Sequence, residues 1–228
     1  MPLAILVAIL SIAFAVSPLL VPGFGGFDPT QFPIPQENPP VQPAGYAFSI
    51  WGPIYLWLIV SAVYGLRRVP EWSAMRQTLA LSLAIGVPWL HVAVMSPVWA
   101  TVLIWAMLIT AVIALFRAPH QDAPWAAWPV GLYAGWLSAA SCVSLGLVAA
   151  GYGWMSGRTA AYVFVGLAIL LPLLVQSRLK RAPTYGLAVI WALIAVAVQN
   201  WGTATGVAWL ALIGAVLMVI PVVRSARL

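Results

Sequence analysis

Hydrophobic and polar positions alternate along this chain in long blocks, without the short periods of a soluble helix or strand. Apolar runs are separated by brief segments that carry the charged residues. A run of roughly 18 or more apolar residues is long enough to cross a bilayer as a helix. The pattern predicts eight spanning helices, at about 2–21, 45–66, 77–95, 98–116, 125–150, 158–176, 183–199 and 204–223.

The segments between the runs have the composition of turns. The longest, loop one, covers residues 22–44, is rich in proline and glycine, and contains Asp28 and Glu37 but no Lys or Arg. Proline removes a backbone donor and restricts the residue before it, so this loop cannot continue the first helix. We expect Pro88 to kink the third helix, which a helix bundle tolerates.

The composition agrees with a membrane protein. The chain is 64% hydrophobic and 6% charged, whereas soluble domains carry about 25% charged residues. The expected fold class is therefore an all-α integral membrane protein, a bundle of about eight helices. No basic segment precedes the first run, so we interpret it as a retained helix and not as a cleaved signal peptide. The single cysteine, Cys142, excludes an intrachain disulfide and a multi-cysteine metal site.

The basic residues predict the orientation of the bundle. With the N-terminus inside, nine of the ten Lys and Arg residues fall in inner connections and Arg158 falls in an outer one. This asymmetry follows the positive-inside rule. It predicts that both termini are cytoplasmic and that loop one is on the outer side, and we expect the membrane to be a bacterial inner membrane. The inner residues are Arg67, Arg68, Arg76, Arg117, Arg178, Lys180, Arg181, Arg224 and Arg227.

The stretch from Asn38 to Tyr55 combines a rigid turn with an aromatic face. The prolines of Asn38-Pro39-Pro40 prevent a helix there, and an apolar helix follows after Gly45. Residues three and four apart share one face of a helix, which brings together Phe48, Trp51 and Tyr55. Such a face can line a pocket for a flat hydrophobic ligand, or it can anchor the helix at the membrane interface. The residues alone favour the anchor.

Two motifs in this chain are similar to those of a known family. Asn38-Pro39-Pro40 with the following Trp51-x-x-x-Tyr55 resembles the first loop and second helix of the TspO/MBR proteins. These are the tryptophan-rich sensory proteins, or peripheral-type benzodiazepine receptors. Tyr133-x-x-Trp136-x-Ser138 resembles the fifth helix of the same family. The resemblance covers roughly residues 1–150 and is closer to the longer, divergent bacterial members.

This resemblance implies a function and a division of the chain. It implies a TspO-like five-helix core at 1–150, which leaves 151–228 as an additional three-helix segment. It also implies a porphyrin, haem or related tetrapyrrole bound under loop one, by a protein that acts as a sensor, carrier or regulator. Loop-one N–H groups and Arg158 are candidates to hold the ligand's carboxylates. The ligand-binding residues implied are Asn38, Pro39, Pro40, Phe48, Trp51, Tyr55, His91, Tyr133 and Trp136.

Several polar or small residues at membrane depth are further candidates, since such residues are often functional. His91 can be an axial ligand to a haem iron, a donor to a carboxylate, or an interfacial histidine bonded to a carbonyl or water. Asn200 is expected to cap the seventh helix. The small residues of the fifth helix, including Gly131-x-x-x-Gly135 and three serines spaced by three, favour close helix packing.

Other function classes find little support in the residues. There is no pair of carboxylates within a span, no Ser-His-Asp set and no charged residue in the middle of a span. The lack of a charged residue at mid-span argues against a proton-coupled pump and a charged channel. The residues do not call for an enzyme, and a light- or oxygen-driven tetrapyrrole reaction stays open as the enzymatic alternative. We expect no required cofactor, no metal and no nucleic acid partner. The expected partners are lipid, a tetrapyrrole, and a second copy or a membrane protein at the C-terminal helices. An accessory subunit without a ligand is the main alternative, and a secondary transporter is the third.

Overall fold

A computed structural model describes residues 1–21, 23–68, 70–179 and 181–226 of the chain. Within these residues, eight helices are long and apolar enough to cross a membrane. This confirms the expected eight-helix bundle. The helices are α1 (Pro2–Val16), α2 (Trp51–Gly65), α3 (Ser73–Met95), α4 (Pro97–Arg117), α5 (Ala127–Gly151), α6 (Gly157–Leu179), α7 (Pro183–Asn200) and α8 (Thr205–Ala226). Three short 3-10 helices accompany them: η1 (Ser17–Leu20) extends α1, η2 (Pro29–Gln31) lies within loop one, and η3 (Gly45–Ile50) leads into α2.

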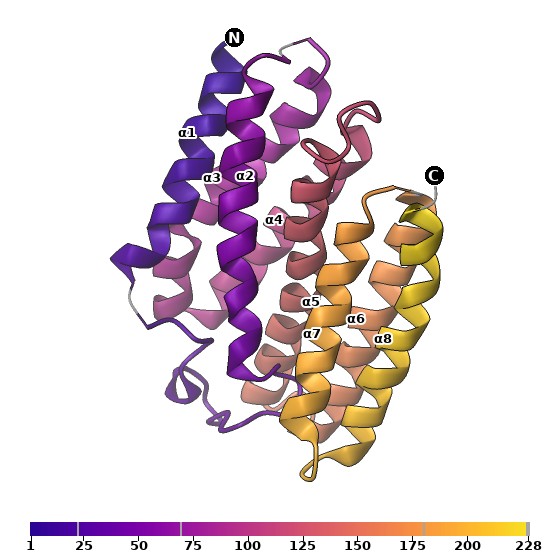
Figure 1. The fold of residues 1–228 in the computed structure, drawn as a ribbon. Helices are drawn as coiled ribbons and strands as arrows, with labels where there is room; N and C mark the ends of the chain where they lie inside the picture. The colour runs from indigo at the N-terminus through magenta and orange to yellow at the C-terminus, as the bar shows by residue number, and fades with distance from the viewer. Residues whose placement is uncertain (22, 69, 180, 227–228) are drawn as a thin grey trace.

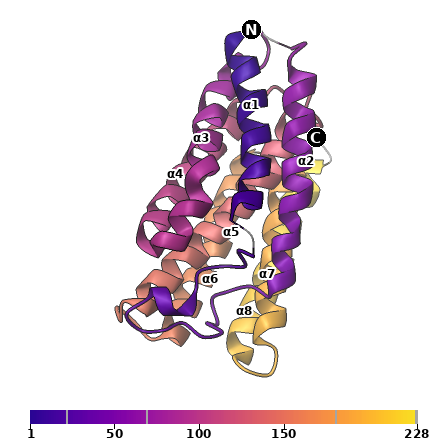
Figure 2. The same cartoon turned by 90° about the vertical axis from the view of Figure 1, so that its left-hand side faces the viewer.

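The fifth helix is the centre of the bundle. It packs against α2 and α4 on one side and against α6 and α7 on the other, and Figure 1 shows it between the two groups of helices. Most of its residues are buried, whereas in α1 only Ala4, Val7, Ser11 and Phe14 are buried. Contacts therefore continue beyond residue 150, the predicted end of the five-helix core. Both termini lie at the end of the bundle opposite loop one (Figures 1 and 2).

The small residues of α5 bring α7 close. A side chain at Gly131 would meet Thr184, and one at Gly135 would meet the backbone of Tyr185. This confirms the predicted packing role of the glycine pair and identifies the neighbour as α7 of the same chain. The serines bond to two helices: Ser138 to the Tyr185 hydroxyl at 2.8 Å, Ser141 to the Ile104 carbonyl at 3.4 Å, and Ser144 to the Thr101 hydroxyl.

Arg76 differs from its predicted place in a charged turn. The third helix begins at Ser73, four residues earlier than expected, so Arg76 lies in its first turn and is buried. Its guanidinium donates to the Gly65 carbonyl and lies 5.7 Å from the centre of the Trp72 ring. A cation beside the carboxyl end of α2 and over an aromatic face is favourably placed.

At the end of the bundle where the termini lie, side chains link the inter-helix connections to one another and to helix ends. Asp122 accepts a hydrogen bond from the Trp72 indole at 3.0 Å and lies 3.6 Å from Nε of Arg68. Arg181 donates to the Phe116 carbonyl at 2.6 Å, so the loop before α7 caps the end of α4. Among the described residues, every Lys or Arg except Arg158 lies at this end. Lys180 and Arg227 were also predicted there, but they lie outside the described residues. Pro22 of loop one lies outside them as well.

Loop one crosses the opposite end of the bundle (Figure 2). Asp28 begins the short η2 turn with a capping box, and its hydrogen bonds from the hydroxyl and amide of Thr30 lower the pKa of its carboxyl group. Gln31 then donates to the Ala93 carbonyl at the end of α3 at 3.0 Å. The amide of Ile34 donates to the Gly151 carbonyl at the end of α5 at 2.9 Å. The loop is thereby fixed across helices that are distant in sequence.

Candidate functional site

Six aromatic side chains meet beneath loop one. We call them the aromatic cluster: Phe14, Phe48, Trp51, Tyr55, Tyr133 and Trp136. Trp51 and Tyr55 stack with their centres 5.3 Å apart and their planes 15° from parallel. Trp136 meets Trp51 edge to face at 6.1 Å. The spacing that placed Trp51 and Tyr55 on one face therefore does bring them together, and α5 adds the third ring.

The remaining rings complete the cluster from neighbouring elements. Phe48 lies in η3 and meets Trp136 edge to face at 5.9 Å. Phe14 lies near the end of α1 and meets Tyr55 at 5.1 Å and Tyr133 at 5.7 Å. Edge-to-face contacts of this kind fix ring orientations beyond what burial alone does. The cluster is thus a rigid wall built by α1, η3, α2 and α5.

A cavity of about 280 Å³ lies against this wall. We call it the main cavity. Ligand sites in proteins are typically about 300–1,000 Å³, mostly apolar, with a few polar groups that fix orientation. The main cavity is near the lower end of that range and is lined mainly by apolar side chains. Its lining residues are Phe14, Pro18, Val21, Gly23, Phe24, Phe48, Trp51, Tyr55, Trp89, Leu90, Ile104, Met107, Trp136, Leu137 and Ala140.

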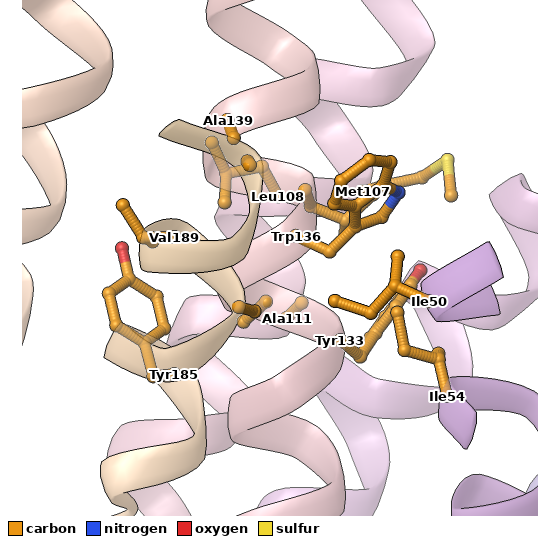
Figure 3. Packing of buried hydrophobic residues seen from close by; sticks show 14 of the residues in the cluster. Ile50, Ile54, Met107, Leu108, Ala111, Tyr133, Trp136, Ala139, Tyr185 and Val189 are labelled. Atoms are coloured by element: carbon orange, nitrogen blue, oxygen red, sulfur yellow. The ribbon is translucent and has the colours of Figure 1, made fainter. Parts of the chain in front are cut away.

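Trp136 supplies an unused hydrogen-bond donor at the cavity wall. Its side chain is 2% exposed, and its indole N–H has no hydrogen-bond partner. In Figure 3 the indole nitrogen is on the side of the ring toward Met107, which lines the same cavity. A buried polar group without a partner costs free energy. An acceptor atom brought within hydrogen-bond distance of this N–H would remove this cost.

Tyr133 supports the cluster without lining the cavity. It is fully buried, and its hydroxyl lies 3.0 Å from the Ser82 hydroxyl, which donates to the Met107 carbonyl at 2.8 Å. This chain of bonds joins α5 to α3 and α4. The Tyr133 ring holds Phe14 in place, so its role in the site is indirect.

The Asn38-Pro39-Pro40 turn lies away from the cavity. Asn38 is exposed with a φ of 46°, Pro39 is buried, and none of the three residues lines the main cavity. The Pro40 carbonyl instead accepts a hydrogen bond from Nδ2 of Asn200 on α7 at 2.8 Å. The motif therefore forms an attachment point for loop one and is not part of the cavity wall.

Two further bonds attach the segment before α2 to α7. The Ala44 amide donates to the Ala195 carbonyl at 3.1 Å, and the Trp191 indole donates to the Ala47 carbonyl at 3.0 Å. The segment that carries Phe48, a lining residue of the main cavity, is thus attached to a helix beyond residue 151. Sequence reasoning assigned Asn200 to capping α7, and its side chain does bond to Val196 within that helix, but the bond to loop one was not foreseen.

Two candidates chosen from the sequence lie outside the cavity. His91 is exposed on α3, and Arg158 is exposed in the first turn of α6. Neither lines the main cavity, so we leave both out of the candidate site. In the described ranges, no three His, Cys, Asp or Glu side chains gather as metal ligands would.

Several lining residues were not selected from the sequence. Phe14 and Phe24 carry no motif and no polar group that would set them apart from other apolar positions. Trp89 could have been noticed because it is two residues from His91; its indole donates to the Ala100 carbonyl at 2.9 Å, which turns its ring inward. Helices in lipid are apolar on every face, so hydrophobicity does not separate inner from outer positions.

Comparison with known proteins agrees with the motifs on α2 and α5. A family model described as TSPO-like protein matches residues 4–224, a range that reaches into all eight of the helices given above. No curated protein and no solved structure matches the chain. The eight apolar helices make the chain an integral membrane protein. By its family match, the chain belongs to the TSPO-like proteins.

Proposed function

We propose that this protein binds a flat, largely apolar ligand of the tetrapyrrole class in the main cavity, as a sensor, carrier or regulator. The observation that carries the proposal is the buried indole N–H of Trp136, which has no partner and belongs to a ring at the cavity wall. An aromatic wall favours a planar ligand by stacking and edge contacts. The free donor favours one with an acceptor atom.

The lining residues favour a macrocycle without a bound metal. Neither a histidine nor a cysteine is among the described residues that line the main cavity, and imidazole and thiolate are common ligands of haem iron. Protoporphyrin is therefore the first probe. A complete macrocycle is larger than the main cavity alone, so we expect Phe24 and the neighbouring part of loop one to move when it binds.

Replacing Trp136 with phenylalanine tests the role of the indole donor. The Trp136→Phe variant keeps an aromatic ring but loses the N–H, and we expect protoporphyrin to bind about tenfold more weakly, the loss typical of one hydrogen bond in an apolar site. An absorbance titration of the purified protein in mild detergent measures the change.

Trp105 provides a matched control for this experiment. Its indole N–H is also buried without a partner, but the residue does not line the main cavity. The Trp105→Phe variant should bind protoporphyrin as the unchanged protein does. Equal affinities for the unchanged protein and Trp136→Phe would contradict the assigned donor. Unsaturable uptake by all three proteins would instead favour an accessory subunit without a ligand.

The orientation of the bundle is part of the proposal, because it decides the side from which a ligand enters. We expect loop one to be outside, since the basic residues gather at the other end. In a Cys142→Ser background, a cysteine at exposed Glu37 should react with an impermeant maleimide on intact cells. A cysteine at exposed Arg178 should react only after the membrane is opened. Labelling of both positions from the same side would overturn this topology.

A further inference from the structure

A second, smaller cavity of about 70 Å³ adjoins the main one, and we call it the side cavity. It extends between α5, α6 and α7, under Gln42 and Pro43 of loop one. Six residues line both cavities, so the two spaces are neighbours across shared walls. These residues are Phe24, Phe48, Trp89, Ile104, Trp136 and Ala140.

The lining of the side cavity is almost entirely apolar. One hydroxyl at its edge, that of Ser144, is bonded to the Thr101 hydroxyl, which in turn donates to the Pro97 carbonyl at 2.7 Å. These groups are satisfied within the protein and leave few polar partners for water. An apolar cavity of this kind stays dry and accepts apolar groups.

Small side chains create the space. Ala139 on α5, Ala168 on α6 and Ala192 on α7 are each at most 4% exposed and line the side cavity from three directions. Larger residues at these positions would close it. Two of the three walls come from helices beyond residue 151, so those helices contribute to the shape of the space beside the main cavity.

We propose that the side cavity binds a short hydrocarbon arm of the ligand whose planar ring occupies the main cavity. This rests on the proposed function, because the ring must first bind. Each water-sized group occupies about 30 Å³ of liquid volume, so the side cavity suits an arm of a few carbon atoms. The protein therefore selects flat ligands that carry an apolar substituent on one edge, and α6 and α7 supply that selectivity.

Two probes that differ only in the arm test this inference. Unsubstituted porphine supplies the ring, and a porphine with a single butyl group supplies the ring and the arm. The unchanged protein should bind the butyl compound about tenfold more tightly, since the butyl group gains packing contacts in a cavity that is otherwise empty. Porphine that binds saturably with no preference for the butyl compound would overturn this inference alone. Failure of both compounds to bind would overturn the proposed function.

Filling the side cavity should remove the preference. In the Ala168→Leu and Ala192→Leu variants, the two compounds should bind with nearly equal affinity, while porphine binds within about twofold of its original affinity. Ala84→Leu, at an exposed position of α3, is the control and should keep the tenfold preference. All proteins are compared in the same detergent, so partition of the butyl compound into micelles cancels. A preference that survives in both filled variants would overturn the inference.

Discussion

The Gly135→Ala variant is expected to lose about 3 kcal/mol of folding free energy, at the upper end for an overpacked core. A methyl group at Gly135 would lie 2.1 Å from the Tyr185 carbonyl oxygen and 3.0 Å from Cβ of Ala188. The first of these atoms is backbone of α7 and cannot rotate away. The two helices must separate, which also stretches the bond between Ser138 and Tyr185 at the next turn.

Unfolding in a mixed-micelle titration measures this loss. The matched control is Gly166→Ala on α6, where an added methyl group meets nothing within 4 Å. Alanine has the higher helix propensity, so this variant should be unchanged or slightly more stable, by at most about 1 kcal/mol. Similar midpoints for Gly135→Ala and the unchanged protein would mean that α5 and α7 are less close than described.

The contact between α5 and α7 shows what the sequence can predict about this fold. Eight spans follow from the length of the apolar runs, and the glycine pair on α5 indicates that some helix approaches closely. The identity of that helix does not follow, because small residues permit contact without specifying a partner. Arg76 shows a related limit. Its charge led to its prediction as part of a turn, although the carbonyl end of α2 and the Trp72 ring stabilise it within a helix.

The site was predictable where residues are close in sequence. Helical spacing gives the Trp51–Tyr55 pair, and the motif on α5 gives Trp136. Phe14 and Trp89 belong to other helices and have no pattern that points to the cavity. The motif also led to the assignment of Asn38, Pro39 and Pro40 to ligand contact, whereas in the structure none of the three lines the main cavity and the Pro40 carbonyl accepts a bond from Asn200 of α7. Contacts between distant segments require the three-dimensional structure.

Replacement of Asn200 should weaken the attachment of loop one to α7 most directly. Its amide donates to the Pro40 carbonyl of loop one at 2.8 Å, and the side chain is 1% exposed. In an Asn200→Ala variant the Pro40 carbonyl loses this donor, at a cost of about 2 kcal/mol. We expect protease cleavage within loop one to become faster by more than tenfold, because local opening carries less free energy.

The adjacent residue separates this effect from a general change in α7. Gln199 lies one position earlier in the same helix and is partly exposed, so Gln199→Ala should leave the cleavage rate unchanged. Protoporphyrin should protect loop one from cleavage in both variants. The protection should be smaller in Asn200→Ala, since the ligand must then order a loop that opens more easily. Equal cleavage of Asn200→Ala and Gln199→Ala would show that the other attachments, from Ala44 and Trp191 to α7, hold the loop without Asn200. Loop one would then be fixed to α7 mainly at the segment before α2, and not at the proline turn.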